Sequence, residues 1–181
     1  MQPLYCVVGI SGSGKDSVVQ EMCRLTGKKQ VISYATRPRR INEGETHIFI
    51  KPEDVVEYER DFAAYTEING YSYFTTKSQL LDPEIMFYII DPNGVKWLKQ
   101  NFNERDIYVI YVRVDPDTSK QRALSRGDSE ETYDNRHKSE IGQFMDFIVE
   151  KEYDSVIDNC CDLDFAILQF THILVGKETE W

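Results

Sequence analysis

The sequence predicts an α/β fold in which a parallel central sheet is interrupted by a smaller β-rich insertion. Short apolar runs alternate with helical stretches along most of the chain, which is typical of strand–helix–strand units. A glycine-rich loop joins the first apolar run to the first helix. Between about residues 34 and 84 the alternation stops and a hairpin signal takes its place. We expect one domain that spans residues 1–181.

Composition and charge favour a globular protein and disfavour one that binds nucleic acid or a membrane surface. The 181 residues are 41% hydrophobic, which is enough for one core. The formal net charge is −10, from 21 basic and 31 acidic residues, so a nucleic-acid coat or a membrane-surface protein is a poor interpretation. Four cysteines without C-x-x-C spacing indicate reduced thiols, and neither a signal peptide nor a membrane span is visible. We expect a cytoplasmic protein with small-molecule substrates, as a monomer or a homodimer, and with no nucleic-acid or membrane partner.

The first elements follow the strand–helix pattern. Leu4–Val8 is a continuous apolar run and predicts a strand buried on both faces. A helix is expected over Lys15–Leu25, with Gly27 as its stop signal. Val31–Ser33 predicts a second strand. The charged, turn-rich stretch Thr36–Glu45 predicts an exposed functional loop.

The middle of the chain predicts the inserted lobe. His47–Ile50 reads as a strand, and Pro52–Glu59 as a short helix with proline in its first turn. Two further strands are expected at Phe62–Ile68 and Tyr71–Thr75. The Asn69-Gly70 pair between them is a strong signal for a β-hairpin.

Alternation resumes in the second half of the chain. Asp115 is a good N-cap and Pro116 suits the first position of a helix. The expected strands are Ile85–Ile90, Ile107–Val114 and Ser155–Ile157, and the expected helices are Asn93–Asn101, Pro116–Ser125, Ser129–Tyr153 and Asp164–Val175. Ligands of parallel sheets gather at the carboxyl ends of the strands. The loops after Val8, Ser33 and Ile90 should therefore converge on one cleft.

The loop after the first strand has the sequence Gly9-Ile10-Ser11-Gly12-Ser13-Gly14-Lys15. A strand before it and a helix after it make the context of a Walker A phosphate loop, or P-loop. Its amides and the helix N-terminus would point at a phosphate, and Lys15 would reach the β- and γ-phosphates of ATP. A glycine-rich turn without a ligand is the alternative. We expect a P-loop NTPase fold with these ATP-binding residues: Gly9, Ser11, Gly12, Ser13, Gly14, Lys15, Asp16 and Ser17.

The residue after the P-loop lysine departs from the motif. A serine or threonine hydroxyl usually binds Mg²⁺ at this position, but here Asp16 stands there and Ser17 follows. An anionic side chain near a triphosphate is unfavourable unless a cation lies between them. Asp16 therefore either holds Mg²⁺ through water or turns away and caps the helix. The candidate magnesium ligands are Asp16, Ser17 and Asp91.

A dense basic patch, Thr36-Arg37-Pro38-Arg39-Arg40, follows Ser33 in this acidic chain. Guanidinium groups suit bidentate recognition of phosphate. A solvated charged loop is the alternative. Because the patch follows a P-loop and an early strand, we expect it to hold the phosphate of an acceptor.

The chain resembles the guanylate kinase family from about Pro3 to Phe170. The shared features occur in the family's order and approximate spacing: the P-loop, the Thr-Arg-Pro-x-Arg run, the Tyr73 region, Ile90-Asp91-x-x-Gly94, and Arg122, Arg126 and Arg136. The resemblance implies a P-loop core of about residues 1–33, 85–121 and 138–181. It also implies a nucleoside-monophosphate-binding lobe of about residues 34–84 and a helical lid of about residues 122–137.

The resemblance also assigns residues to roles. Ser33, Arg37, Arg40 and Tyr73 match residues that hold the acceptor phosphate, and Thr75 and Asp91 match residues on the guanine side. Asp91 is also open to a role with magnesium-bound water. Asn159 matches an adenine-side asparagine, or is a simple turn residue. The residues implied in catalysis are Lys15, Arg37, Arg122, Arg126 and Arg136. The alternative for the lid arginines is a helix surface that pairs with Glu130 and Glu131.

Three positions of the lobe depart from the family pattern. His47 stands where the family has a tyrosine, and Phe74 stands where it has a glycine. Ala64 stands where a glutamate reads the guanine edge. Glu67 would replace that glutamate only in a different strand register, because residues 64 and 67 face opposite sides of a strand. We keep Glu67 and His47 as candidate acceptor-binding residues.

The predicted function is ATP- and Mg²⁺-dependent phosphoryl transfer to a nucleoside monophosphate, by default GMP or dGMP. Such transfer needs positioning and positive charge around the moving phosphoryl group. One alternative is a kinase of altered base specificity. Another is a ribose 1,5-bisphosphate phosphokinase, which the Gly14-Lys15-Asp16-Ser17 run and the Glu45-x-His47-Ile48 segment resemble more weakly. A non-catalytic guanylate-kinase-like binding module is a further alternative, which the intact P-loop disfavours.

Overall fold

The main sheet of the protein is fully parallel. The computed structural model describes residues 2–39 and 44–178. The order of strands is β2-β7-β1-β8-β9, and each strand runs parallel to its neighbours. The strands are β1 (Leu4–Val8), β2 (Lys29–Gln30), β7 (Ile85–Ile89), β8 (Ile107–Arg113) and β9 (Ser155–Asp158). The predicted parallel central sheet is therefore confirmed, and the carboxyl ends of its strands share one edge.

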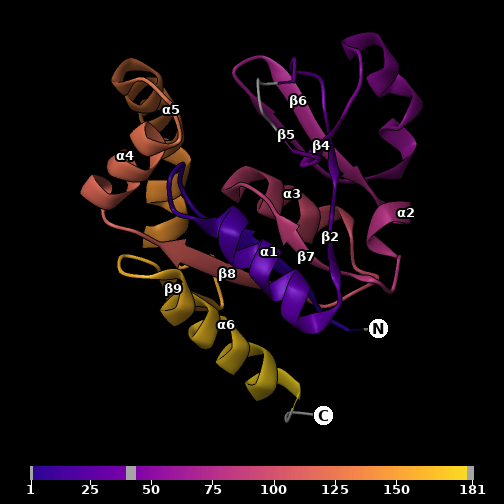
Figure 1. Ribbon diagram of the computed structural model, residues 1–181. Helices are drawn as coiled ribbons and strands as arrows, with labels where there is room; N and C mark the ends of the chain where they lie inside the picture. The colour runs from indigo at the N-terminus through magenta and orange to yellow at the C-terminus, as the bar shows by residue number, and fades with distance from the viewer. Residues whose placement is uncertain (1, 40–43, 179–181) are drawn as a thin grey trace.

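Helices cover both faces of this sheet (Figure 1). The long helices are α1 (Lys15–Thr26), α3 (Pro92–Asn101), α4 (Pro116–Ser125), α5 (Glu130–Val149) and α6 (Leu163–Glu178). Three of them begin at a side-chain cap, because Asp91, Asp115 and Ser129 each accept the amide N–H three residues later. The left-handed Gly27, with φ 70°, ends α1 as the sequence predicts.

The alternating side chains of β1 explain why its whole sequence is apolar. Tyr5 and Val7 pack in one buried cluster with residues of α1 and α6, among them Val18 and Phe170. The intervening Leu4, Cys6 and Val8 belong to the cluster on the opposite face, with residues of α3 and α5. Both faces of the strand are buried, so every position takes an apolar side chain. The stretch that leads into the P-loop is thus held in the centre of the core.

A second, mixed sheet stands beside the first, in the order β4-β3-β6-β5. Its strands are β3 (Ser33–Ala35), β4 (His47–Phe49), β5 (Phe62–Ile68) and β6 (Tyr71–Thr76), and it carries the short helices η1 (Pro52–Glu57), η2 (Glu59–Asp61) and α2 (Lys77–Leu80). Asn69 and Gly70 both have positive φ, as a two-residue hairpin turn requires. The predicted hairpin is therefore confirmed.

Aromatic rings pack against one another on one side of the second sheet. The ring centroids of Tyr34 and Phe74 lie 4.9 Å apart, and those of Phe62 and Phe74 lie 4.6 Å apart. On the other side, Ala63 and Ala64 join the core cluster that α3 covers. The inserted sheet is therefore anchored to the main core through β5.

The second predicted strand, Val31–Ser33, is wrong in its extent. Lys29 and Gln30 pair with β7 in the main sheet, whereas Ser33 begins β3 in the second sheet. The chain passes from one sheet to the other at Val31 and Ile32. Ser33 therefore does not lie at the carboxyl end of a main-sheet strand, and it reaches the site from the second sheet. In place of the predicted helix Pro52–Glu59 the structure has two short 3₁₀ helices, η1 and η2, and the second ends at Asp61.

Candidate active site

The P-loop wraps around the N-terminus of α1. Gly12 and Gly14 have φ values of +82° and +80°, which favour glycine. A Cβ atom at Gly12 would lie 2.3 Å from the carbonyl oxygen of Ser119 in α4, so the loop packs closely against that helix. Gly14 is the N-cap of α1 and makes no side-chain cap hydrogen bond. The first amides of the helix are therefore left for an anion.

Lys15 and Asp16 stand at the beginning of α1. The Lys15 Nζ atom lies 3.9 Å from Asp16 Oδ2, and the side chain of Asp16 is more than half exposed. Asp16 does not cap the helix, because Gly14 occupies the N-cap position. An exposed ion pair of this length holds Lys15 weakly. Lys15 can therefore turn to a phosphate bound at the loop.

Asn159 supports the P-loop from the end of β9. Its side chain is 3% exposed, and its Nδ2 atom donates to the carbonyl oxygen of Ser13 at 2.7 Å. Arg122 of α4 donates to the carbonyl oxygens of Asn159 and Cys161. A Cβ atom at Gly14 would lie 3.5 Å from Arg122 Nη1, so this guanidinium is beside the loop. Asn159 therefore acts on the loop backbone in this structure.

Glu140 of α5 also contacts the P-loop, and sequence reasoning missed it. The Ser11 amide donates to Glu140 Oε2 at 2.9 Å, and the Ser11 hydroxyl donates to Glu140 Oε1 at 2.7 Å. In Figure 1 the indigo loop before α1 extends toward α5, in agreement with these contacts. A carboxylate thus occupies one end of an anion-binding loop.

The predicted acceptor-phosphate residues meet where β3, β4 and β6 lie side by side. The hydroxyl of Ser33 and Nδ1 of His47 share a hydrogen bond of 2.9 Å. The rings of His47 and Tyr73 lie 5.7 Å apart. The structure therefore brings Ser33, His47 and Tyr73 together, although Ser33 arrives from an unexpected direction.

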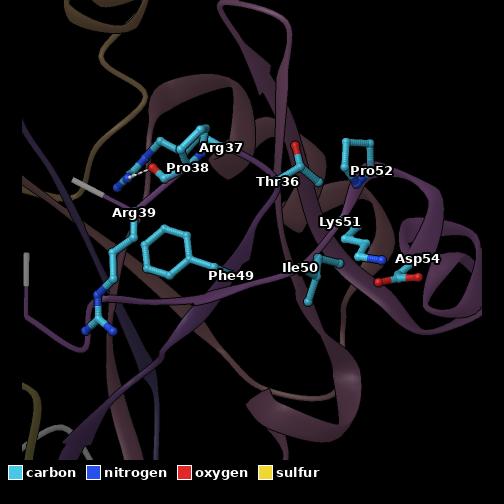
Figure 2. Close-up of a pocket in the computed structure, with 9 residues that line it drawn as sticks. All are labelled: Thr36, Arg37, Pro38, Arg39, Phe49, Ile50, Lys51, Pro52 and Asp54. Carbon is cyan, nitrogen blue, oxygen red and sulfur yellow. Dashed lines mark hydrogen bonds between the residues drawn. The ribbon is translucent and has the colours of Figure 1, made fainter.

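Arg37 follows the end of β3, packs on Phe49 beside His47, and is only 7% exposed. Its guanidinium stands 5.1 Å from the ring centre of Phe49 and donates to the carbonyl oxygen of Pro38. Arg39 lies 5.7 Å from the same ring, and Figure 2 shows Phe49 between the two arginines. A pocket of about 490 Å³ opens here between the ends of β3 and β4. Arg40 lies outside the described residues.

The β5–β6 register decides which lobe residues share a face. Ala64 pairs with Thr75, and Thr66 pairs with Tyr73, so these four side chains lie on one face. Glu67 pairs with Ser72 on the other face and is exposed. The structure therefore does not bring Glu67 to the face of Tyr73. Thr75 is buried, and its hydroxyl donates to Oε1 of Gln79.

Asp91 ends the loop after β7 and carries a partly unsatisfied carboxylate. Its Oδ1 atom accepts the amide of Gly94 at 2.8 Å, while Oδ2 is buried and has no partner among the described residues. Burial raises the pKa of this carboxyl, and the charge of Glu140 adds to the rise. The hydrogen bond from the Gly94 amide lowers that pKa by less. An orphaned carboxylate oxygen of this kind fits a cation or a ligand N–H group.

The lid arginines divide into two groups. Arg126 and Arg136 both bind Oδ2 of Asp128, at 2.7 and 3.1 Å, whereas Arg122 binds the backbone after β9. Among the described residues, none of the three arginines forms an ion pair with Glu130 or Glu131, the alternative that the sequence offers, and Glu130 contacts Lys120. The structure thus brings only Arg122 beside the P-loop.

Comparison with known proteins assigns the chain to a family. The family model described as guanylate kinase matches residues 1–176. The chain belongs to the guanylate kinase family. A guanylate kinase of Fusobacterium nucleatum is 30% identical over 168 residues, which cover 86% of this chain and 87% of the relative. A guanylate kinase of Clostridium tetani is 27% identical over 168 residues, which cover 88% of this chain and 80% of the relative.

Structural comparison supports the same fold. The crystal structure of guanylate kinase from Anaplasma phagocytophilum matches with a TM-score of 0.68 and 18% sequence identity, over 97% of this chain and 86% of that one. The predicted P-loop NTPase fold of the guanylate kinase family is therefore confirmed. Within the described residues, no helix combines the length and the apolarity that crossing a bilayer requires.

Thr66, Phe49 and Asp128 are further residues that sequence reasoning missed. The register of a hairpin places Thr66 opposite Tyr73, so a prediction of the hairpin pairing contained this signal. The packing of Arg37 and Arg39 on Phe49 depends on tertiary structure, so no sequence pattern predicts it.

We expect Asp91→Asn to raise the free energy of unfolding at pH 7. The folded pKa of Asp91 lies above its unfolded value, so the charged form disfavours folding once the pH exceeds about 4. Asparagine keeps an oxygen for the Gly94 amide, so α3 keeps its cap. Denaturant unfolding between pH 3.5 and 8 measures the difference, which should shrink toward zero at the acidic end. If the variant gained the same unfolding free energy at pH 3.5 as at pH 8, the buried charge of Asp91 would not be the cause.

Proposed function

We propose that the protein transfers the γ-phosphoryl group of ATP to GMP or dGMP, which yields ADP and the nucleoside diphosphate. This proposal rests on the family match over residues 1–176 together with a P-loop that is intact from Gly9 to Lys15, at the edge of the main sheet. The family acts on small-molecule substrates, and ATP is its phosphate donor. The nucleoside monophosphate kinase class follows from the same membership.

The donor site is the P-loop with Lys15. The uncapped N-terminus of α1 and the left-handed glycines leave backbone N–H groups for the phosphates. Lys15 would neutralise charge on the β- and γ-phosphates. Asn159 would act indirectly, because it holds the Ser13 carbonyl and so fixes the shape of the loop. Arg122 would supply positive charge beside Gly14.

Magnesium fits the carboxylates of this site. The orphaned Oδ2 of Asp91 and the exposed Asp16 next to Ser17 are oxygen donors of the kind that Mg²⁺ uses beside phosphates. When bound, Mg²⁺ would neutralise phosphate charge during transfer. We assign Asp16, Ser17 and Asp91 as its candidate partners, through water where the distance requires it.

The acceptor site is the group formed by Ser33, Arg37, His47 and Tyr73. The Ser33 hydroxyl with its hydrogen-bonded His47 ring, and the Arg37 guanidinium, suit a phosphate monoester. Arg37 would move from the Pro38 carbonyl to donate to that phosphate. We also include Arg40 in the acceptor site, because it matches a phosphate-binding residue of the family in sequence. Asp91 and Thr75 would meet the base, and Arg126 and Arg136 would close over the transferred group.

One feature favours a second candidate, a kinase of altered base specificity. Ala64 is buried and offers no hydrogen bond, and Glu67 faces the other side of β5. The nearby side chains that can bind a base edge are therefore Thr66, Thr75 and Asp91. The comparisons support none of the alternatives, whether altered base specificity, ribose 1,5-bisphosphate as acceptor or a binding module, so the second candidate rests on this feature of the lobe alone.

A panel of acceptors tests the proposed function. ADP release would be measured with ATP and Mg²⁺ against each ribo- and deoxyribonucleoside monophosphate and ribose 1,5-bisphosphate. We expect the highest kcat/KM with GMP or dGMP. A preference for another monophosphate would support the second candidate, and no turnover with any acceptor would contradict both.

We expect Tyr73→Phe to raise the KM for GMP about tenfold, because a hydroxyl that donates to a charged phosphate contributes about 1.5–3 kcal/mol. Steady-state kinetics at saturating ATP measures this change. Tyr71→Phe is the matched control, since Tyr71 lies on the same strand and is exposed. Equal KM values for the two variants would remove Tyr73 from the acceptor site.

A further inference from the structure

The carboxylate of Glu140 binds the P-loop as an anion would. Both of its oxygens accept hydrogen bonds from one residue, Ser11, through the backbone amide and the hydroxyl. Charge-assisted hydrogen bonds of this length are among the stronger ones in proteins. The contact joins residues 129 positions apart in the chain. It therefore fastens α5 to the loop.

The other amides of the P-loop do not bind Glu140. The Ser13 amide donates to the Ile10 carbonyl within the loop's own turn. Among the described residues, no acceptor is assigned to the amides of Gly14, Lys15 and Asp16 at the start of α1. An anion can enter at that end without displacing anything. At Ser11 it meets a negative charge that is already in place.

We propose that Glu140 is an internal competitor of the triphosphate, which occupies Ser11 in the nucleotide-free protein and leaves when ATP binds. Carboxylate and phosphate oxygens use the same N–H and O–H donors, and two anions cannot share them without strong repulsion. The ATP-bound state must therefore break the Ser11–Glu140 contact. This inference rests on the proposed role of the P-loop as the ATP site.

The same contact couples ATP binding to movement of α5. Arg136 lies four residues before Glu140, so both side chains project from the same face of the helix. While Glu140 is bound to Ser11, α5 is held in its present position and Arg136 is paired with Asp128. Loss of the Glu140 contact lets α5 shift relative to the loop. ATP would thus select the arrangement in which Arg136 can leave Asp128.

Glu140→Gln tests the proposal, because it keeps the shape and an acceptor oxygen but removes the charge. The dissociation constants of ATP and ADP would be measured by titration calorimetry with Mg²⁺ and without acceptor. We expect the variant to bind ATP about tenfold more tightly than the wild type, within the usual range of such couplings. ADP should gain less, because it carries one phosphate fewer. Glu140→Ala should change ATP affinity in the same direction.

Glu131→Gln is the matched control, with the same loss of charge at an exposed position of α5. It should leave the affinity for ATP within about twofold, since exposed charges are screened. An unchanged or weaker affinity in a folded Glu140→Gln variant would overturn the competitor role while leaving the proposed function in place. No ATP binding by either the wild type or the variant would overturn the proposed function, and the inference with it.

Discussion

Replacing Lys15 with alanine should abolish nearly all phosphoryl transfer, with a loss of roughly 10²–10³-fold in kcat. Lys15 is the side-chain cation at the mouth of the P-loop, and its only ionic partner in the described structure is the exposed Asp16. Removal of one preorganised group that stabilises developing charge costs about 2.7–4 kcal/mol in the transition state. Because the Lys15–Asp16 pair is weak, the stability of the fold should hardly change. Steady-state kinetics and thermal unfolding of the variant measure both effects.

Lys28→Ala is the control for this experiment. Lys28 lies beyond the opposite end of α1 and pairs with Glu84 at the surface. It should keep the activity of the wild type within about twofold. Full activity in Lys15→Ala would show that phosphate transfer does not use the P-loop lysine. A large drop in the melting temperature of Lys15→Ala would mean that the lysine also stabilises the fold.

Gly12→Ala should cause the largest loss of stability of any P-loop substitution that adds a single methyl group. At φ +82° an alanine costs about 1–2 kcal/mol, and its Cβ atom would lie 2.3 Å from the Ser119 carbonyl oxygen. That oxygen belongs to the backbone of α4 and cannot rotate away, so the loop or the helix must shift. We expect a destabilisation of about 3–5 kcal/mol together with loss of ATP binding. Denaturant unfolding and ATP titration measure the two effects.

Gly27→Ala separates the strain of the backbone from the steric clash. Gly27 has φ +70°, but no atom lies within 4 Å of the position its Cβ would take. The Gly27→Ala substitution should therefore lower the free energy of unfolding only by the backbone strain, about 1–2 kcal/mol. If Gly12→Ala and Gly27→Ala are equally stable, the close packing of the P-loop on α4 is not what makes alanine unfavourable at position 12.

Local signals predicted the elements that carry the donor site. The apolar run of β1, the glycines of the P-loop and the cap at Asp115 are all encoded within a few residues. The hairpin at Asn69-Gly70 is encoded in the same way, because both residues accept positive φ. Family resemblance then gave the fold and the enzyme class, both of which the comparisons confirm.

Long-range pairing explains what sequence reasoning missed. The sequence predicts Ser33 in the main sheet, because nothing in Val31 and Ile32 marks the passage from one sheet to the other. The contact between Ser11 and Glu140 depends on where α5 packs, and no local sequence pattern indicates that position. The assignment of individual residues to ATP, magnesium and acceptor, and the division into core, lobe and lid, stay predictions.

The fate of the γ-phosphoryl group of ATP distinguishes transfer to GMP from hydrolysis. ATP labelled in its γ-phosphate would be incubated with the protein, Mg²⁺ and GMP, and the products separated. We expect the label to appear in the β-phosphate of GDP, in a one-to-one ratio with ADP, and Lys15→Ala to abolish this transfer. Label recovered as inorganic phosphate, or retained in ATP at saturating GMP, would contradict this expectation.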